Sequence, residues 1–192
     1  MVLTTNIVGT EPEKVTREWL ETWSRTVSLV LTLVPFTGIA FLWFTGVIRD
    51  WLGDREDQFF STIFFGSAII QVSLWFLWGA VFRAVLSTRV LAAVGLAGNE
   101  TTVFGFVLMS AIIGDYVLRM AGVYMTAIGT LGTKTGAMPR WLIIVTYVLA
   151  LGFLVAAPRL REARYAFPAW VLVVSVYILV LNYRRTHDHE GK

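Results

Sequence analysis

The stretch VFGFVLMSAIIGDYVLRMAGVYMTAIGTL, residues 103–131, decides the fold because it is apolar, long and interrupted only by two opposite charges. A helix needs about 20 mostly apolar residues to cross a bilayer. Asp115 and Arg119 lie four residues apart and therefore share one face of such a helix. A charged side chain at this depth costs about 2.5–3.5 kcal/mol on insertion scales, so it normally faces a bundle interior or a water-filled path. The pair is the first candidate for a functional site.

Four further segments of the 192-residue chain have the length and apolar content of membrane-spanning helices. Only 15% of all residues are charged, against about 25% in a soluble domain, and the charges avoid the long apolar runs. The predicted spans are residues 26–48, 60–82, 103–131, 141–157 and 167–183. The sequence therefore predicts an all-α integral membrane helical bundle with five transmembrane helices, in a single domain over residues 1–192.

The two ends of the chain are polar or amphipathic. In residues 1–25 and into the first span, Val15, Trp19, Trp23 and Val27 recur every four residues. This spacing predicts an amphipathic N-terminal helix that lies at the membrane interface and continues into the first span. A plain soluble helical extension is the alternative. Residues 184–192 are expected to form a polar, disordered tail.

Several local features are expected to extend or interrupt the helices. Residues 83–98 either extend the second helix past the membrane surface or lie flat on that surface. Pro35 predicts a kink or a water-accessible gap in the first span. Pro139 fits the first turn of the fourth helix, where its missing N–H costs nothing. Three glycines, Gly129, Gly132 and Gly136, are expected to loosen the chain before that helix.

Aromatic side chains near the predicted helix ends are candidates for the membrane interface. Packing against a neighbouring helix is the alternative for each of them. They are Trp51, Trp141, Tyr165, Trp170 and Tyr183.

The link between the last two predicted spans is short and basic. Its length predicts that these spans form an antiparallel hairpin. Arg159, Arg161 and Arg164 lie in this link, and basic residues in short loops favour the cytoplasmic side. With five spans, this places the N-terminus in the cytoplasm.

The face of Asp115 continues along its helix as a stripe of charged, hydroxyl and small side chains. Small residues let a neighbouring helix approach closely, so the stripe is expected to point inward. Gln71, near the middle of the second span, is predicted to hydrogen-bond across to Asp115 and Arg119. Weaker polar contributions are expected from Thr146, Tyr147, Ser175 and Tyr177. The stripe consists of Ala111, Asp115, Arg119, Gly122, Thr126 and Gly129.

The sequence allows three interpretations of this polar cluster. Asp115, Arg119, Gln71 and Thr126 are candidates for an ion path, a proton path or a small polar-ligand site. An internal salt bridge that fixes helix packing is the second interpretation, because a pair at positions i and i+4 can neutralise itself. A contact between copies of the chain in an oligomer is the third.

The residue inventory disfavours an enzyme. The chain has no cysteine, so it has no thiol nucleophile and no disulfide. An intramembrane aspartyl protease needs two membrane aspartates, and the predicted spans contain only Asp115. A membrane serine protease needs a histidine within the bundle, and a retinal protein needs a lysine there, but both residue types lie outside the spans. No catalytic residue and no cofactor are therefore predicted.

Metal and nucleic-acid binding are also disfavoured. Asp54, Glu56 and Asp57 form the densest acidic cluster but lack the spacing of a calcium loop, and they fit better in the first turn of the second helix. His187 and His189 flank an aspartate in the polar tail, which is at best a weak metal ligand set. No basic block exceeds a few residues, so no nucleic-acid partner is expected.

Three stretches of the chain carry a resemblance to other proteins. The first runs from Gly53 to Phe60 and on to Gly66 and Ser67, the second is Arg119, and the third lies between Gly129 and Leu142. Together they resemble a group of uncharacterised small multi-pass membrane proteins of high-GC bacteria. The resemblance covers about half of the chain and implies no established activity, cofactor or catalytic residue. It implies a bacterial plasma membrane, the inner membrane, as the location.

The sequence thus favours a non-catalytic integral membrane protein that acts as a scaffold, accessory or regulatory subunit. The alternative is a small oligomeric channel or transporter whose polar path is lined by Asp115, Arg119 and Gln71. Membrane lipids are the expected partners, together with a second copy of the chain or another membrane protein.

Overall fold

The computed structural model describes the backbone of residues 17–52, 58–93, 99–156 and 163–190. Side chains are described over 28–52, 59–88, 100–155 and 165–183. Apart from a short link before residue 140, this part of the chain is helical and contains no strand, which confirms the all-α prediction. The helices are α2 (Arg17–Leu52), α3 (Gln58–Ala93), α4 (Asn99–Ala111), the π-helix η2 (Ile112–Val117), α5 (Leu118–Thr135), α6 (Arg140–Ala156) and α7 (Ala163–Glu190).

Four helical stretches are long and apolar enough to cross a membrane. They are Ser28–Leu52, Phe59–Thr88, Glu100–Thr135 and Tyr165–Tyr183. The remaining predicted span lies in α6, which has 17 residues. At about 1.5 Å per residue, α6 extends about 25 Å, less than the roughly 30 Å of a bilayer's hydrocarbon core. The structure therefore contains four full-length candidate spans where five were predicted, with α6 as a shorter apolar helix.

Several helices continue beyond the predicted spans. α2 begins at Arg17 and runs unbroken into the first candidate span, as expected for the N-terminal helix, although Val15 lies outside the described residues. α3 continues to Ala93, so its last turns extend the second helix, and residues 94–98 lie outside the described part. α7 continues to Glu190, and the prediction of a disordered tail is wrong for that stretch. Charged residues exclude a segment from the membrane core without breaking its helix.

The prolines and glycines interrupt the helices less than the sequence predicted. α2 stays helical through Pro35. Pro139 precedes the first helical residue of α6, and its carbonyl accepts the N–H groups of Leu142 and Ile143 at 3.0 and 3.2 Å. Pro139 is therefore the N-cap residue, one position earlier than predicted. Gly136 has a φ of 67°, a left-handed conformation that glycine adopts without strain and that ends α5.

The chain divides into two compact units. Unit 1 contains the chain up to Phe41 together with Ile70–Val117, and unit 2 contains Leu42–Ile69 together with the chain from Leu118. The divisions in α2 and α3 fall inside the helix, and the third falls where η2 meets α5.

Unit 1 is held together by an apolar core between helices. α2 and α3 approach closely where a Cβ on Gly38 would lie 2.6 Å from the ring of Phe76. α3 and α4 approach where a Cβ on Gly105 would meet Val85. The buried core residues of this unit are Leu31, Trp78, Phe82, Val85, Met109, Ile112 and Val117.

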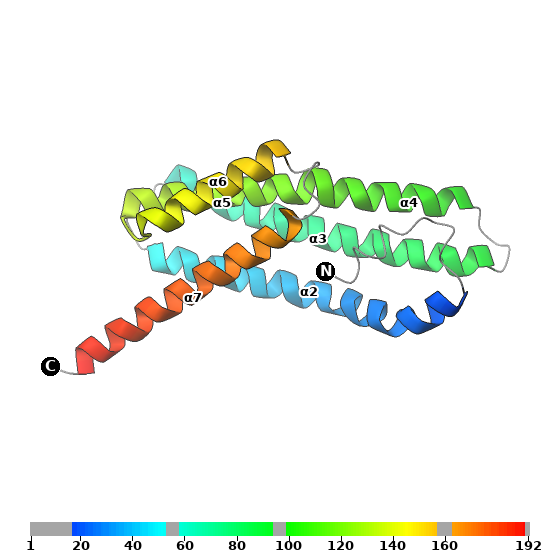
Figure 1. The fold of residues 1–192 in the computed structure, drawn as a ribbon, viewed down its shortest axis with the longest axis horizontal. Helices are drawn as coiled ribbons and strands as arrows, with labels where there is room; N and C mark the ends of the chain where they lie inside the picture. The colour runs from blue at the N-terminus through cyan, green and yellow to red at the C-terminus, as the bar shows by residue number, and fades with distance from the viewer. Residues whose placement is uncertain (1–16, 53–57, 94–98, 157–162, 191–192) are drawn as a thin grey trace. The chain divides into compact units, whose positions relative to one another are not determined.

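Unit 2 is built around α5 and α6, which lie side by side as an antiparallel pair (Figure 1). The fully buried ring of Tyr124 stacks on Phe64 with 5.1 Å between ring centroids. Phe167 and Trp170 of α7 meet the same ring edge-on at 6.2 and 6.4 Å. The rings of Phe153 and Phe167 meet at 6.5 Å, which agrees with the predicted contact between the last two helices.

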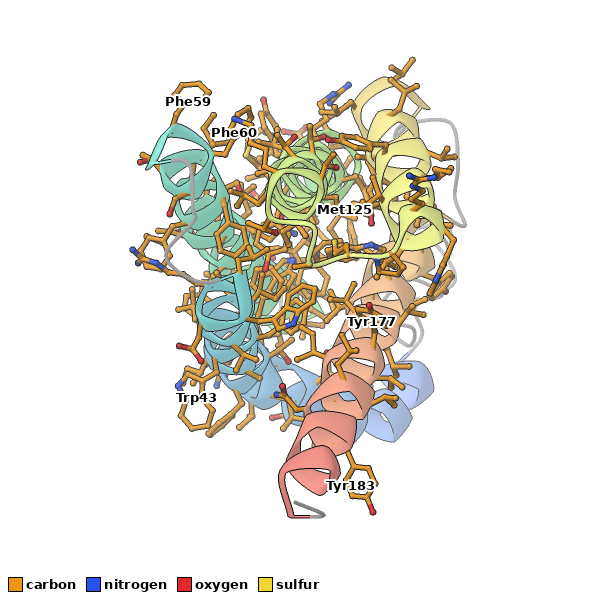
Figure 2. All side chains as sticks on the ribbon, turned by 90° about the vertical axis from the view of Figure 1, so that its left-hand side faces the viewer. Trp43, Phe59, Phe60, Met125, Tyr177 and Tyr183 are labelled. Carbon is orange, nitrogen blue, oxygen red and sulfur yellow. The ribbon has the colours of Figure 1, made fainter. Side chains whose placement is uncertain are left out.

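Large apolar side chains are exposed on helices of both units. In unit 2, Trp43 is 75% exposed and Tyr183 is 68% exposed, and both point outward, whereas Met125 is fully buried among the helices (Figure 2). In unit 1, Phe36 and Phe104 are exposed to a similar degree. The buried cores are therefore flanked by apolar surfaces rather than polar ones.

The predicted interfacial aromatics separate into two groups. Trp141, Tyr165 and Tyr183 are exposed, as side chains at a membrane interface are expected to be. Trp170 is 2% exposed and packs inside unit 2 instead, and the half-buried Trp51 meets Tyr177 edge-on at 6.2 Å. For these two residues the packing alternative holds.

Candidate functional site

The C-terminal half of the predicted stripe is a helix-packing surface in unit 2. A Cβ on Gly122 would lie 2.9 Å from Leu154 and 3.0 Å from the carbonyl oxygen of Ala150. A Cβ on Gly129 would lie 3.2 Å from the ring of Tyr147. These small residues admit α6, as the sequence predicted for a neighbouring helix.

Thr126 and Gly132 lie on the same helix and have local partners. The half-buried Thr126 donates its hydroxyl to the carbonyl of Gly122 at 2.8 Å, within its own helix. A Cβ on Gly132 would lie 2.6 Å from Met138 Sδ. Gly129 is thus packed against α6 and Gly132 against the link before α6, and the expectation that they loosen the chain is wrong.

Asp115 lies in the π-helix η2, which interrupts the stripe. A π-helical turn holds one more residue than an α-helical turn, so the positions on either side of it no longer follow one α-helical face. Asp115 belongs to unit 1 and Arg119 to unit 2, and both side chains are half-buried. A direct bridge between them stays a prediction. Single π-turns inside α-helices occur frequently at functional sites.

Gln71 is completely buried, but it does not make the predicted hydrogen bond. Neither Oε1 nor Nε2 of this side chain has a hydrogen-bond partner among the described residues. The prediction that Gln71 satisfies Asp115 and Arg119 is therefore wrong. The partners of a buried amide depend on tertiary packing, which a polar residue inside an apolar run does not specify.

Gln71, Trp75 and Trp78 form what we call the α3 strip, a row of buried polar atoms in unit 1. Their spacing of four and three residues places them on one face of α3. The Nε1 atoms of Trp75 and Trp78 are buried and, in the part of the chain that is described, have no hydrogen-bond partner. The Trp75 ring meets Phe41 edge-on at 5.1 Å, and the Trp78 ring lies against Phe82 at 5.3 Å. The rings are fixed by packing while their N–H groups remain unpaired.

The α3 strip runs beside the π-helix within unit 1. Trp78 shares an apolar core with Ile112 and Val117 of η2. α3 and the helix that follows it are antiparallel, and Val85 lies opposite Gly105. Trp75 lies ten residues before Val85 on α3, and Asp115 lies ten residues after Gly105 on the following helix. Each step corresponds to about 15 Å along its helix axis. The unpaired strip and the only acidic residue of η2 are therefore at the same level.

The buried polar groups of unit 2 are paired with one another. Trp170 donates its indole N–H to Thr146 Oγ1 at 2.8 Å, and the hydroxyls of Thr45 and Tyr124 share a hydrogen bond of 3.0 Å. At an exposed position, Tyr147 shares one with Thr130, also at 3.0 Å.

The residues predicted to support Asp115 and Arg119 from the last two helices have other partners. Thr146 and Tyr147 take part in the hydrogen bonds with Trp170 and Thr130. Ser175 donates to the carbonyl of Val171 at 2.8 Å. The pairing of Thr45 with Tyr124 was not predicted from the sequence. The two residues are 79 positions apart, so no local pattern indicates their contact.

The two metal candidates fall outside the described side chains. Asp54, Glu56 and Asp57 lie in the undescribed link before α3, and the side chains of His187 and His189 are likewise undescribed. Within the described residues, no group of three or more His, Cys, Asp or Glu side chains is arranged to hold a metal ion.

The comparisons with known proteins give no relative from which a role could be taken. No family model, no curated protein and no solved structure matches the chain. The resemblance to small multi-pass proteins of high-GC bacteria therefore stays a prediction.

Proposed function

We propose that this chain is a multi-pass protein of a bacterial plasma membrane with a non-catalytic role, as a scaffold, accessory or regulatory subunit of a membrane assembly. The observation that carries the proposal is the exposed apolar surface of its helices. A soluble monomer rarely exposes an apolar patch larger than a few hundred Å². In lipid, such faces are in contact with acyl chains and need no further partner.

The fifth span of the proposal is α6. Apart from Arg140 at its start and Tyr147, its exposed side chains are apolar, and α6 lies antiparallel to α5, whose helix is long enough to cross a membrane. A helix a few Å shorter than the hydrocarbon core is accommodated by local thinning of the bilayer. The exposed apolar residues are Trp141, Ile144, Val145, Val148, Leu151, Leu154 and Val155.

The non-catalytic role is favoured by the way in which unit 2 uses its polar and small residues. The glycines of α5 admit α6, and the hydroxyl groups in the core pair with one another or with Trp170. These groups stabilise helix packing, which is what a structural component of an assembly requires. Membrane lipids and a second membrane protein, or a second copy of the chain, are the proposed partners.

The number of spans is tested by the sides on which the ends of the chain lie. The native chain has no cysteine, so Thr5→Cys and Lys192→Cys each introduce a unique thiol. Five spans predict that a membrane-impermeant thiol reagent added to intact spheroplasts labels only one of the two variants, and the expected cytoplasmic N-terminus makes this Lys192→Cys. Labelling of both or of neither would mean an even number of spans.

The accessory role is tested by purification in a mild detergent. We expect another membrane protein to co-purify with the chain at a fixed stoichiometry. A chain that stays monomeric and unaccompanied in native lipid nanodiscs would contradict this role.

A channel or transporter is the second candidate, and it is favoured by the unpaired α3 strip at the level of Asp115. In this role the polar groups of unit 1 line a path for a small polar solute. The Asp115→Asn variant is then expected to change solute or proton flux in liposomes without changing the thermal stability. Unchanged flux, at equal protein content, would remove Asp115 from the path.

A further inference from the structure

The α3 strip has a marked excess of hydrogen-bond donors. Gln71 offers two N–H groups and one carbonyl, and each of the two indoles offers one N–H and no acceptor. The strip therefore presents four donors and one acceptor, all without partners among the described residues. Buried polar groups in proteins are almost always satisfied by protein or by ordered water. The occupant that satisfies this strip must accept hydrogen bonds.

Burial restricts the size of that occupant. Gln71 is 0% exposed and Trp78 is 5% exposed. A lipid headgroup or a second copy of the chain approaches from outside and does not reach these atoms. The strip therefore suits a molecule small enough to lie inside a helix bundle.

Charge restricts its chemistry. The strip itself contains only neutral groups, and Asp115, the acidic residue of η2, lies at the level of Trp75. An anion would lose its hydration there without meeting a cation of the strip. Water accepts two hydrogen bonds and donates two, so it can accept from the indole and amide N–H groups and donate to the carbonyl of Gln71 and to a carboxylate.

We propose that the α3 strip is a binding site for internal water molecules, which lie along Gln71, Trp75 and Trp78 in the middle of the membrane. The site extends about 10 Å along α3, from the first of these residues to the last. The water molecules satisfy the strip and hydrate unit 1 at the level of Asp115. The inference rests on the proposed membrane insertion, and it identifies water-sized neutral molecules as the class that the path of the second candidate function would accept.

The glutamine inventory of the chain gives a direct test. Gln58 and Gln71 are its two glutamines, so side-chain ¹⁵N labelling of glutamine produces two amide signals in the complete protein in liposomes. The Gln71→Leu variant assigns the signals by removing one of them, and Gln58→Ala does the same if the first variant does not fold. Solid-state NMR then measures magnetisation transfer from water to each amide.

We expect strong transfer from water to the Gln71 amide, comparable with that to an amide in contact with solvent. Transfer at least about tenfold weaker, at the level of the acyl-chain-facing background, would overturn the proposal. Membrane insertion is checked on the same samples by whether the protein stays with the liposomes after an alkaline carbonate wash. Retention with a dry Gln71 would refute the water site alone, whereas release of the protein by the wash would refute the proposed function as well.

Discussion

The two units of this chain treat buried polar side chains in opposite ways. In unit 2, Trp170 and Tyr124 lie deep in an aromatic core, and each has a hydroxyl partner at 2.8 to 3.0 Å. In unit 1, Trp78 is buried and Trp75 half-buried against neighbouring rings, but their indole N–H groups have no partner among the described residues. Packing and polar satisfaction are therefore separate properties of a membrane helix. Unit 2 has the properties of a fixed frame, and unit 1 has those of a binding region.

The largest effect is expected from disturbing the closed contact between α5 and α6 in unit 2. A Cβ on Gly122 would meet the backbone oxygen of Ala150 at 3.0 Å, and backbone cannot move aside easily. Overpacking of this kind costs about 1–3 kcal/mol. Gly122→Ala should therefore lower the melting temperature in detergent.

The matched control is Gly66→Ala, because a Cβ at Gly66 has no atom within 4 Å. Gly66 is also inside a helix, so both variants gain about the same helix propensity, roughly 1 kcal/mol. We expect Gly66→Ala to be neutral or stabilising. Equal losses for the two variants would mean that α6 does not pack on Gly122.

The second prediction compares the paired and the unpaired indoles. Trp170→Phe removes the donor to the buried hydroxyl of Thr146, and an unsatisfied buried group costs about 1–3 kcal/mol. Trp78→Phe removes a similar ring area but no hydrogen bond to a protein group. We expect Trp170→Phe to lower the free energy of unfolding, measured in detergent–denaturant titrations, by about 1 kcal/mol more than Trp78→Phe does. A larger loss for Trp78→Phe than for Trp170→Phe would contradict the proposed difference between the units.

A smaller effect is expected at the hydrogen bond between Thr45 and Tyr124. Hydrogen bonds between membrane helices contribute about 0.6 kcal/mol on average. In a double-mutant cycle, Thr45→Val and Tyr124→Phe should therefore show a coupling of that size. Fully additive losses would mean that the two hydroxyls do not stabilise unit 2 through each other.

The helical spans follow from the sequence because apolar length is a local property. The run around Asp115 and the runs on either side of Gln71 identify their helices without any knowledge of the fold. Helix ends were predicted less well, since Glu190 and Ala93 lie in polar or mixed stretches that remain helical outside an apolar run. The short α6 is ambiguous for the same reason, because length alone decides between a span and a shorter helix.

The candidate site was predicted only in part. Gln71 stands out in sequence as a polar residue inside an apolar run, but its partners depend on tertiary packing, and the predicted bond does not form. The spacing of Gln71, Trp75 and Trp78 places three polar groups on one helix face, and this pattern can be read from the sequence. The prediction used only the polar stripe of the third helix. The π-turn at Asp115 has no sequence signature, because one extra residue in a helical turn is a property of the backbone.

The contrast between the units is tested most directly by water contact at the indole N–H groups. Tryptophan labelled with ¹⁵N at the indole nitrogen is incorporated into the complete protein in liposomes, and Trp75→Phe, Trp78→Phe and Trp170→Phe assign the three signals. We predict strong magnetisation transfer from water to Trp75 and Trp78, and weak transfer to Trp170, whose N–H is bonded to Thr146. Equal transfer at all three positions, or stronger transfer at Trp170, would contradict the account of a hydrated unit 1 and a dry unit 2.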